Sequence, residues 1–175
     1  MISVIVALVL RLAGNQVPSG AVIPPGELLI GSWVLVSRED RTADTGVVPE
    51  PNLGSDALGL LVYDRAGNVA AQLMRRSRPA RSAAPTPSAP QNLDNSGSID
   101  GYDAYFGTYT LEVGSHVVTH HLLGALLPGD IGKTLTRHFE VSEKDLRLWF
   151  ETTGASGQRV VRTLVWKRSG TRETK

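Results

Sequence analysis

From Leu28 onward, hydrophobic and polar residues alternate along short segments that turn residues separate. Alternation with a period of two is typical of β-strands that bury one face. The pattern predicts about eight strands. They span residues 31–38, 58–63, 69–74, 108–113, 116–123, 134–141, 145–152 and 158–168.

The connections between these segments are nearly all short. Residues 64–68 predict a hairpin in which Gly67 takes a positive φ, and Gly114-Ser115 predicts a two-residue type II′ turn. No strand–helix–strand unit is visible, so the sheet is expected to be antiparallel. A sandwich is the structural alternative, but consecutive short turns favour pairing of each strand with the next. The predicted fold is an all-β, eight-stranded antiparallel up-and-down barrel.

One segment has helical spacing. Tyr102, Tyr105 and Phe106 stand at positions i, i+3 and i+4, and Gly107 follows them. This spacing predicts one short helical segment over residues 99–106.

The N-terminal part differs from the rest in composition. Residues 1–10, MISVIVALVL, are apolar but too few to span a bilayer, which takes about 20 residues. They are interpreted either as an atypical export signal or as an apolar segment packed on the domain. Residues 14–27 resemble a Pro/Gly linker, which favours export and a periplasmic or secreted location. The predicted organisation is residues 1–27 as apolar segment and linker, 28–168 as barrel and 169–175 as flexible tail.

Residues 75–99 interrupt the strand pattern with a stretch rich in Pro, Ser and Ala, which predicts a mobile loop. Its Arg75, Arg76, Arg78 and Arg81 are interpreted either as a solvated rim or as a site for an anion or a protein partner. Across the chain, 18 basic and 17 acidic side chains nearly cancel. This balance argues against nucleic-acid partners and against attraction to an anionic membrane.

The order of several motifs resembles the bacterial lipocalin-like domain family, over residues 29–168. These motifs are GSWVLVS, GLLVYDRAGNVAAQLMR, YDAYFGTYTL, VTHH, LLPGDIG, RHFEV and LVWKR. The resemblance implies an eight-stranded barrel that binds a small hydrophobic molecule. It also implies that a basic residue of the last strand packs over the indole of the Gly-x-Trp motif. Arg162 is the expected partner of Trp33, and the insert after Arg76 departs from the family pattern.

Alternation selects the side chains expected to face the barrel interior. Apolar candidates are Trp33, Leu35, Tyr109, Leu111, Val113, Leu146, Leu148 and Phe150. An interior of this kind either holds an apolar ligand or is filled by its own side chains. The predicted ligand-lining residues are Tyr105, Phe106, Tyr109, His120, His121 and Arg137.

His120 and His121 are adjacent on one strand, so only one of them can face the interior. A buried imidazole beside Tyr109, Glu112 or Arg137 could act as an acid or base. The alternative is a core histidine with its hydrogen bonds satisfied. Arg137 shares a face with Leu135, Phe139 and Val141, so it either meets the carboxylate of a ligand or lies at the barrel mouth.

No catalytic or metal motif accompanies these residues. Cysteine is absent, and neither a Gly-x-Ser-x-Gly elbow nor a dinucleotide fingerprint is present. His116 and His138 show no zinc-site spacing, so no metal and no cofactor are predicted. The leading interpretation is therefore a non-enzymatic barrel that binds a small hydrophobic or amphipathic molecule. An isomerase or cyclase that uses His120 or His121, and an accessory domain that binds a protein through Arg75–Arg81, are the alternatives.

Overall fold

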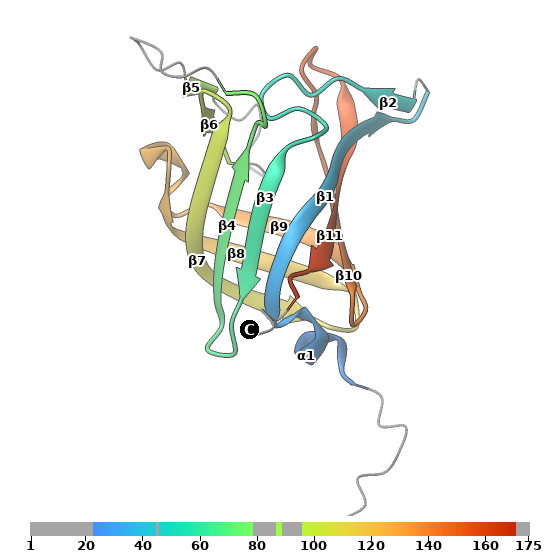
Figure 1. Ribbon diagram of the computed structural model, residues 1–175, viewed down its shortest axis with the longest axis vertical. Helices are drawn as coiled ribbons and strands as arrows, with labels where there is room; N and C mark the ends of the chain where they lie inside the picture. Colours follow the sequence, from blue (N-terminus) through green and yellow to red (C-terminus); the bar gives the residue numbers. More distant parts are fainter. Residues whose placement is uncertain (1–22, 45, 79–86, 89–95, 171–175) are drawn as a thin grey trace, which may run out of the picture.

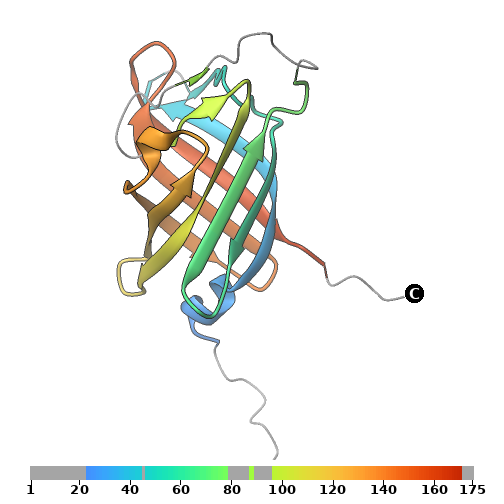
Figure 2. The same cartoon turned by 90° about the vertical axis from the view of Figure 1, so that its left-hand side faces the viewer.

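The protein was analysed as a computed structural model, which describes residues 23–44, 46–78, 87–88 and 96–170. Eight long antiparallel strands form its barrel, as Figures 1 and 2 show. These are β1 (Gly31–Thr42), β3 (Leu58–Tyr63), β4 (Asn68–Met74), β7 (Tyr102–Glu112), β8 (Val117–Ala125), β9 (Thr134–Val141), β10 (Asp145–Thr153) and β11 (Arg159–Arg168). The barrel closes because β1 pairs with both β3 and β11, and β4 pairs with β7. The predicted fold class is confirmed.

Three short strands extend the upper end of the barrel in Figure 1. β2 (Gly46–Val48) pairs with β1, and β5 (Pro87–Ser88) pairs with β6 (Ser98–Ile99). β5 and β6 fall inside the stretch predicted to be one mobile loop. Its described residues therefore contain a strand pair, while residues 79–86 and 89–95 lie outside the described part of the chain.

The predicted position of the helical segment is wrong. Residues 102–106 belong to β7, and residues 100 and 101 form the turn that precedes it, with φ of 48° at Asp100 and 74° at Gly101. β7 pairs with β4 on one side and with β8 on the other, so both neighbours satisfy its backbone groups. The long-range pairing outweighs the helical spacing of the three aromatic residues.

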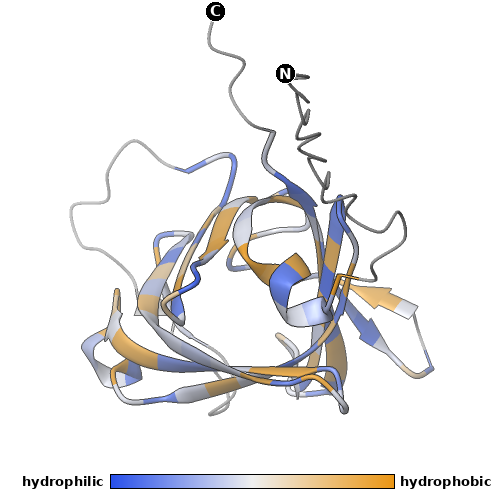
Figure 3. Ribbon diagram, turned by 90° about the horizontal axis from the view of Figure 1, so that it is seen from below, coloured by the Kyte–Doolittle hydropathy of each residue, from blue (hydrophilic) through white to orange (hydrophobic). Residues whose placement is uncertain are grey.

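The short helices lie elsewhere. α1 (Pro25–Leu29) precedes the barrel, and η1 (Pro128–Asp130) is a single 3₁₀ turn between β8 and β9. Pro25 suits the first turn of α1 because its missing N–H would have no partner there. Figure 3 shows α1 across the lower end of the barrel. α1 occupies part of the predicted linker, and the predicted export signal lies outside the described residues.

The lower end is closed by Trp33, Arg168 and α1. The buried indole of Trp33 donates a hydrogen bond to the carbonyl of Leu29 at 2.9 Å. The guanidinium of Arg168 lies 4.2 Å from the Trp33 ring centroid and donates to the carbonyls of Leu28 and Ile30. Arg162 was predicted for this role, which is wrong. Arg162 stands six residues before Arg168 on β11, opposite Asp40, and its side chain pairs with Asp40.

The contact between Arg168 and the Trp33 ring bears on the glycine of the Gly-x-Trp motif, Gly31. A Cβ on Gly31 would lie 2.4 Å from an Arg168 guanidinium nitrogen, and Gly31 has a φ of 140°. The backbone conformation therefore favours glycine, and a Cβ would displace the Arg168 guanidinium from its place at the Trp33 ring.

The interior near α1 is a packed apolar core. Trp33, Leu35 and Leu146 are buried in it as predicted, and Leu148 and Phe150 are also buried as predicted but lie farther from α1, at the cavity. Val113 was expected on the same inner face but is 44% exposed, because β7 ends at Glu112 and Val113 belongs to the following turn. In that turn the positive φ falls on His116 rather than on Gly114, so the predicted type II′ geometry is wrong. Gly67 has the predicted positive φ of 87°.

Candidate ligand-binding cavity

A cavity of about 150 Å³ lies in the half of the barrel remote from α1. Loop residues that follow β2, the turn between β10 and β11, and the serines beside β6 border it. One part of the wall is apolar and comes from β3, β4, β10 and β11. It is formed by Leu61, Ala71, Leu73, Leu148 and Leu164. The remaining wall is largely polar, and several of its groups are charged.

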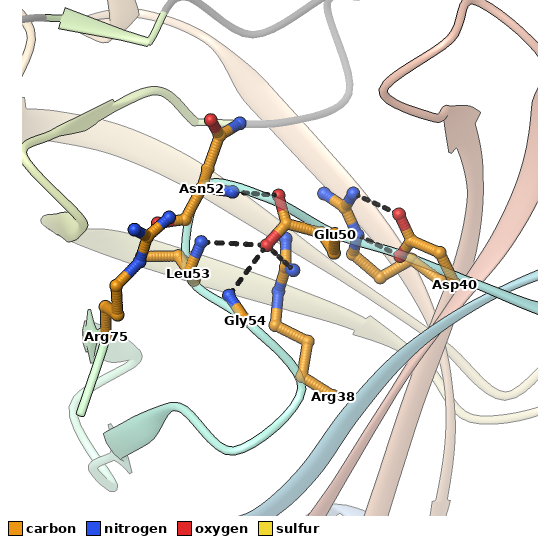
Figure 4. Close-up of polar contacts among 8 residues, drawn as sticks. Arg38, Asp40, Glu50, Asn52, Leu53, Gly54 and Arg75 are labelled. Carbon is orange, nitrogen blue, oxygen red and sulfur yellow. Dashed lines mark hydrogen bonds and ion pairs between the residues drawn. The ribbon is translucent and has the colours of Figure 1, made fainter. Parts of the chain in front are cut away.

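Arg38 and Glu50 form the first buried ion pair of this wall. Arg38 Nη1 lies 2.6 Å from Glu50 Oε2, and the two side chains are 5% and 6% exposed. The Glu50 carboxylate also accepts backbone hydrogen bonds from Asn52, Leu53 and Gly54, as Figure 4 shows. Burial alone would raise the pKa of Glu50, but Arg38 and these N–H groups outweigh it and lower the pKa.

A second ion pair connects the first and last strands. Arg162 donates from Nε and Nη2 to the two oxygens of Asp40, each at 2.6 Å. Arg38 lies close enough to both groups to be affected by them. Burial, together with the charge of Arg162, lowers the pKa of Arg38 to about 10, so the Arg38 guanidinium remains charged at neutral pH.

Arg137 reaches the cavity from β9. Its guanidinium lies 3.5 Å from the centroid of the Phe150 ring and donates to the carbonyl of Thr136 at 2.8 Å. Arg137 is 5% exposed. A buried guanidinium that rests on an aromatic face presents a flat array of N–H donors, which suits a carboxylate.

His120 lies between two tyrosines. Its Nε2 is 2.7 Å from the hydroxyl of Tyr63, and its Nδ1 is 3.0 Å from the hydroxyl of Tyr105. Burial and the nearby charge of Arg137 lower the pKa of His120 to about 3, so the imidazole is neutral at physiological pH. Both nitrogens have tyrosine partners, which differ from the predicted Tyr109, Glu112 and Arg137.

Asp103 adds a carboxyl group two residues before Tyr105 on the same face of β7. It accepts a hydrogen bond from the hydroxyl of Ser96 at 2.5 Å. Burial raises the pKa of Asp103 to about 6, although Ser96 opposes the shift. Two other polar groups of the wall, the indole N–H of Trp166 and the hydroxyl of Ser98, have no hydrogen-bond partner among the described residues.

The comparisons with known proteins agree with this architecture. The lipocalin-like domain model matches residues 30–169, which is most of the chain. The chain belongs to the lipocalin-like domain family. No curated protein matches it significantly.

The lipocalin-like barrel places three of the predicted lining residues on the cavity wall, namely Tyr105, His120 and Arg137. The other three do not line it. Phe106 is 59% exposed on the outer face, and His121 also points outward, where it contacts Thr110. Tyr109 packs against Tyr63 and donates to the carbonyl of Asp64.

Several residues of the cavity were not predicted. Arg38 and Asp40 face the interior because a β-bulge between Leu35 and Ser37 shifts β1 by one residue. Strict alternation from Trp33 would place Ser37 and Glu39 inside instead. Asp103 was assigned to a helical turn, and Arg162 to the wrong neighbour. The sequence signal for Arg38 and Asp40 is two charged residues at a spacing of two on one strand, and Asp103 and Arg162 carry no comparable signal.

The predicted apolar interior is therefore wrong for this half of the barrel. Cavities that hold small molecules typically measure about 300 Å³ or more. The observed cavity has about half that volume and carries three arginines and two carboxyl groups on its wall.

The arginine-rich segment contacts the chain itself where it is described. Arg75 donates to the carbonyl of Asn52, Arg76 lies 3.4 Å from Asp56, and Arg78 donates to the carbonyl of Asp100. Arg81 lies outside the described residues. Among the described residues, no helix is long and apolar enough to cross a membrane.

Proposed function

We propose that this lipocalin-like barrel binds a small amphipathic molecule in the cavity. The apolar part of the ligand would lie against Leu61, Leu73 and Leu148, and an acidic group would face the guanidinium of Arg137. The observation that carries the proposal is the division of one small cavity into an apolar wall and a wall of buried charges.

The energetic cost of these charges supports a role in binding. Moving an ion pair out of water costs several kcal/mol, and apolar replacements of buried pairs are often neutral or stabilising. Arg38, Asp40 and Arg162 are each at most 5% exposed. An apolar interior would serve the barrel fold equally well, so buried charge at the cavity points to recognition of a polar group.

The volume limits the size of the ligand. A protein cavity of about 150 Å³ accommodates benzene. The expected ligand is therefore about one ring in size and carries one polar end. A long-chain fatty acid exceeds the space in this cavity.

Benzoate is a suitable probe because it combines one apolar ring with one carboxylate. Isothermal titration calorimetry of the full chain should show saturable binding of benzoate. Leu73→Trp places a large ring in the cavity and should abolish the binding heat. Gln72→Trp adds the same ring to the exposed face of the same strand and should retain it.

Arg137→Gln tests the charged contact. Loss of one hydrogen-bonded charge should weaken benzoate binding about tenfold or more. Equal binding by the wild type and Leu73→Trp, or no binding by the wild type, would show that the cavity is not the site for such a ligand.

A further inference from the structure

The hydrogen-bond chain Tyr63–His120–Tyr105 has a definite direction. A neutral imidazole has one N–H donor and one acceptor nitrogen, and each of these faces a tyrosine hydroxyl here. Either Tyr63 donates to Nε2 while Nδ1–H donates to Tyr105, or both bonds run the other way. The first arrangement leaves the hydroxyl hydrogen of Tyr105 available, and the second leaves that of Tyr63.

The surroundings of the two tyrosines decide between these arrangements. Tyr63 is 1% exposed, does not line the cavity, and packs edge-on against Tyr109. Among the described residues, its hydroxyl has a hydrogen bond only with His120. A spare hydrogen on Tyr63 would therefore be buried without an acceptor, which is costly. Tyr105 lines the cavity, where a ligand can accept its hydrogen.

We propose that Tyr105 is the hydrogen-bond donor that recognises an oxygen acceptor of the ligand, and that His120 and Tyr63 hold it in the donating orientation. Arg137 lies on the same wall, close enough to affect the pKa values of both Tyr105 and His120. A carboxylate has two oxygens and can accept from Tyr105 and from Arg137 together. The inference rests on the proposed function and narrows its ligand to small carboxylates.

The direction of the chain can be measured without any ligand. Long-range ¹H–¹⁵N NMR of the full chain distinguishes a protonated from an unprotonated ring nitrogen in each histidine, and His120→Gln identifies the signals of His120. We expect the hydrogen of His120 on Nδ1. A hydrogen on Nε2 would overturn the proposed orientation, whether or not benzoate binds.

Binding by matched tyrosine variants tests the contact with the ligand. Tyr105→Phe should weaken benzoate binding about tenfold or more, because one bond to a charged acceptor is lost. Tyr63→Phe removes the hydroxyl that fixes the hydrogen of His120 on Nδ1, so it should weaken benzoate binding by a few fold. Tyr109→Phe is the control, since Tyr109 contacts Tyr63 but does not line the cavity, and its affinity should stay unchanged.

The outcomes separate this inference from the proposed function. Benzoate binding that depends on Arg137 and is unchanged by Tyr105→Phe would overturn the role of Tyr105 and leave the proposed function standing. Benzoate that does not bind the wild type would overturn the proposed function. Benzylamine has the same ring but no acceptor oxygen, and binding of it as tight as that of benzoate would overturn the preference for a carboxylate.

Discussion

At the scale of single residues, Asp103 and His120 both make the stability of the barrel depend on pH, and their contributions change in opposite directions. Folding raises the pKa of Asp103 to about 6, so the folded chain holds a proton between about pH 4 and 6 that the unfolded chain has lost. The contribution of Asp103 to stability is therefore lost as the pH rises through this range. His120, with a folded pKa of about 3, contributes stability that is lost as the pH falls below about 6.5.

Replacement of Asp103 isolates its contribution. Asp103→Asn keeps a polar group of similar size but cannot ionise, so it should gain stability relative to the wild type between pH 4 and pH 7. The shift of about two pKa units corresponds to roughly 1–3 kcal/mol. Urea unfolding of both proteins at the two pH values measures this gain, and the contribution of His120 cancels in the difference. A difference that stays constant with pH would contradict the burial effect at Asp103.

Arg168 is the second residue whose role is local and testable. Its guanidinium contacts the Trp33 ring and the carbonyls of Leu28 and Ile30. Arg168→Ala should lower the free energy of unfolding by about 2–3 kcal/mol, because a cation–π contact and charged hydrogen bonds are lost together.

Arg147 provides a matched control for Arg168. It also lies over a tryptophan, at 4.8 Å from the Trp149 ring, but its side chain is 48% exposed. Arg147→Ala should cost less than about 1 kcal/mol. Equal losses for the two variants in urea unfolding would show that Arg168 does not close the barrel.

At the scale of strands, hydrophobic alternation predicts where the strands lie. Two β-bulges prevent it from predicting which side chains face the interior. The positions of the eight strands follow from their period of two, and their order follows from the short turns. The bulge in β1 reverses the inner and outer faces after Leu35, and a second bulge makes Leu123 an extra residue of β8 opposite Phe106 and Gly107 of β7. A bulge depends on pairing with a distant strand, so the local sequence does not reveal it.

Gly107 tests the close approach of β7 to β8 beside this bulge. A Cβ at this position would lie 1.9 Å from the backbone carbonyl oxygen of His121 on β8, so the two strands would have to separate. Gly107→Ala should therefore destabilise the barrel by about 2–3 kcal/mol. Thermal or urea unfolding measures the loss.

The control is Gly114→Ala, in the turn that joins the same two strands. A Cβ there would meet nothing within 4 Å, and Gly114 has no positive φ. This variant should change stability by less than about 1 kcal/mol, in the stabilising direction. A tolerated Gly107→Ala would mean that β7 and β8 do not approach as closely as described.

At the scale of the whole molecule, the two halves of the barrel interior differ in polarity. Near α1 the interior is filled by Leu29, Trp33, Leu146 and their apolar neighbours, and the sequence pattern predicts Trp33 and Leu146 in this core. The other half holds the charged cavity. Its wall comes from β6, from all eight barrel strands and from the loops around Glu50 and Gly154, so its charged groups meet only in three dimensions. The sequence therefore predicted Tyr105, His120 and Arg137 but not the ion pairs beside them.

From this division we infer that the cavity selects a small carboxylate rather than a long apolar chain. The most direct measurement is a ¹H–¹⁵N NMR titration of the full chain with benzoate and, separately, with palmitate. We predict that benzoate shifts the signals of Tyr105, Arg137 and Phe150 in a saturable way and leaves those of Phe106 and Leu123 on the outer face unchanged. Palmitate should leave the cavity signals unchanged. Saturable shifts of the cavity signals with palmitate, or none with benzoate, would contradict the account.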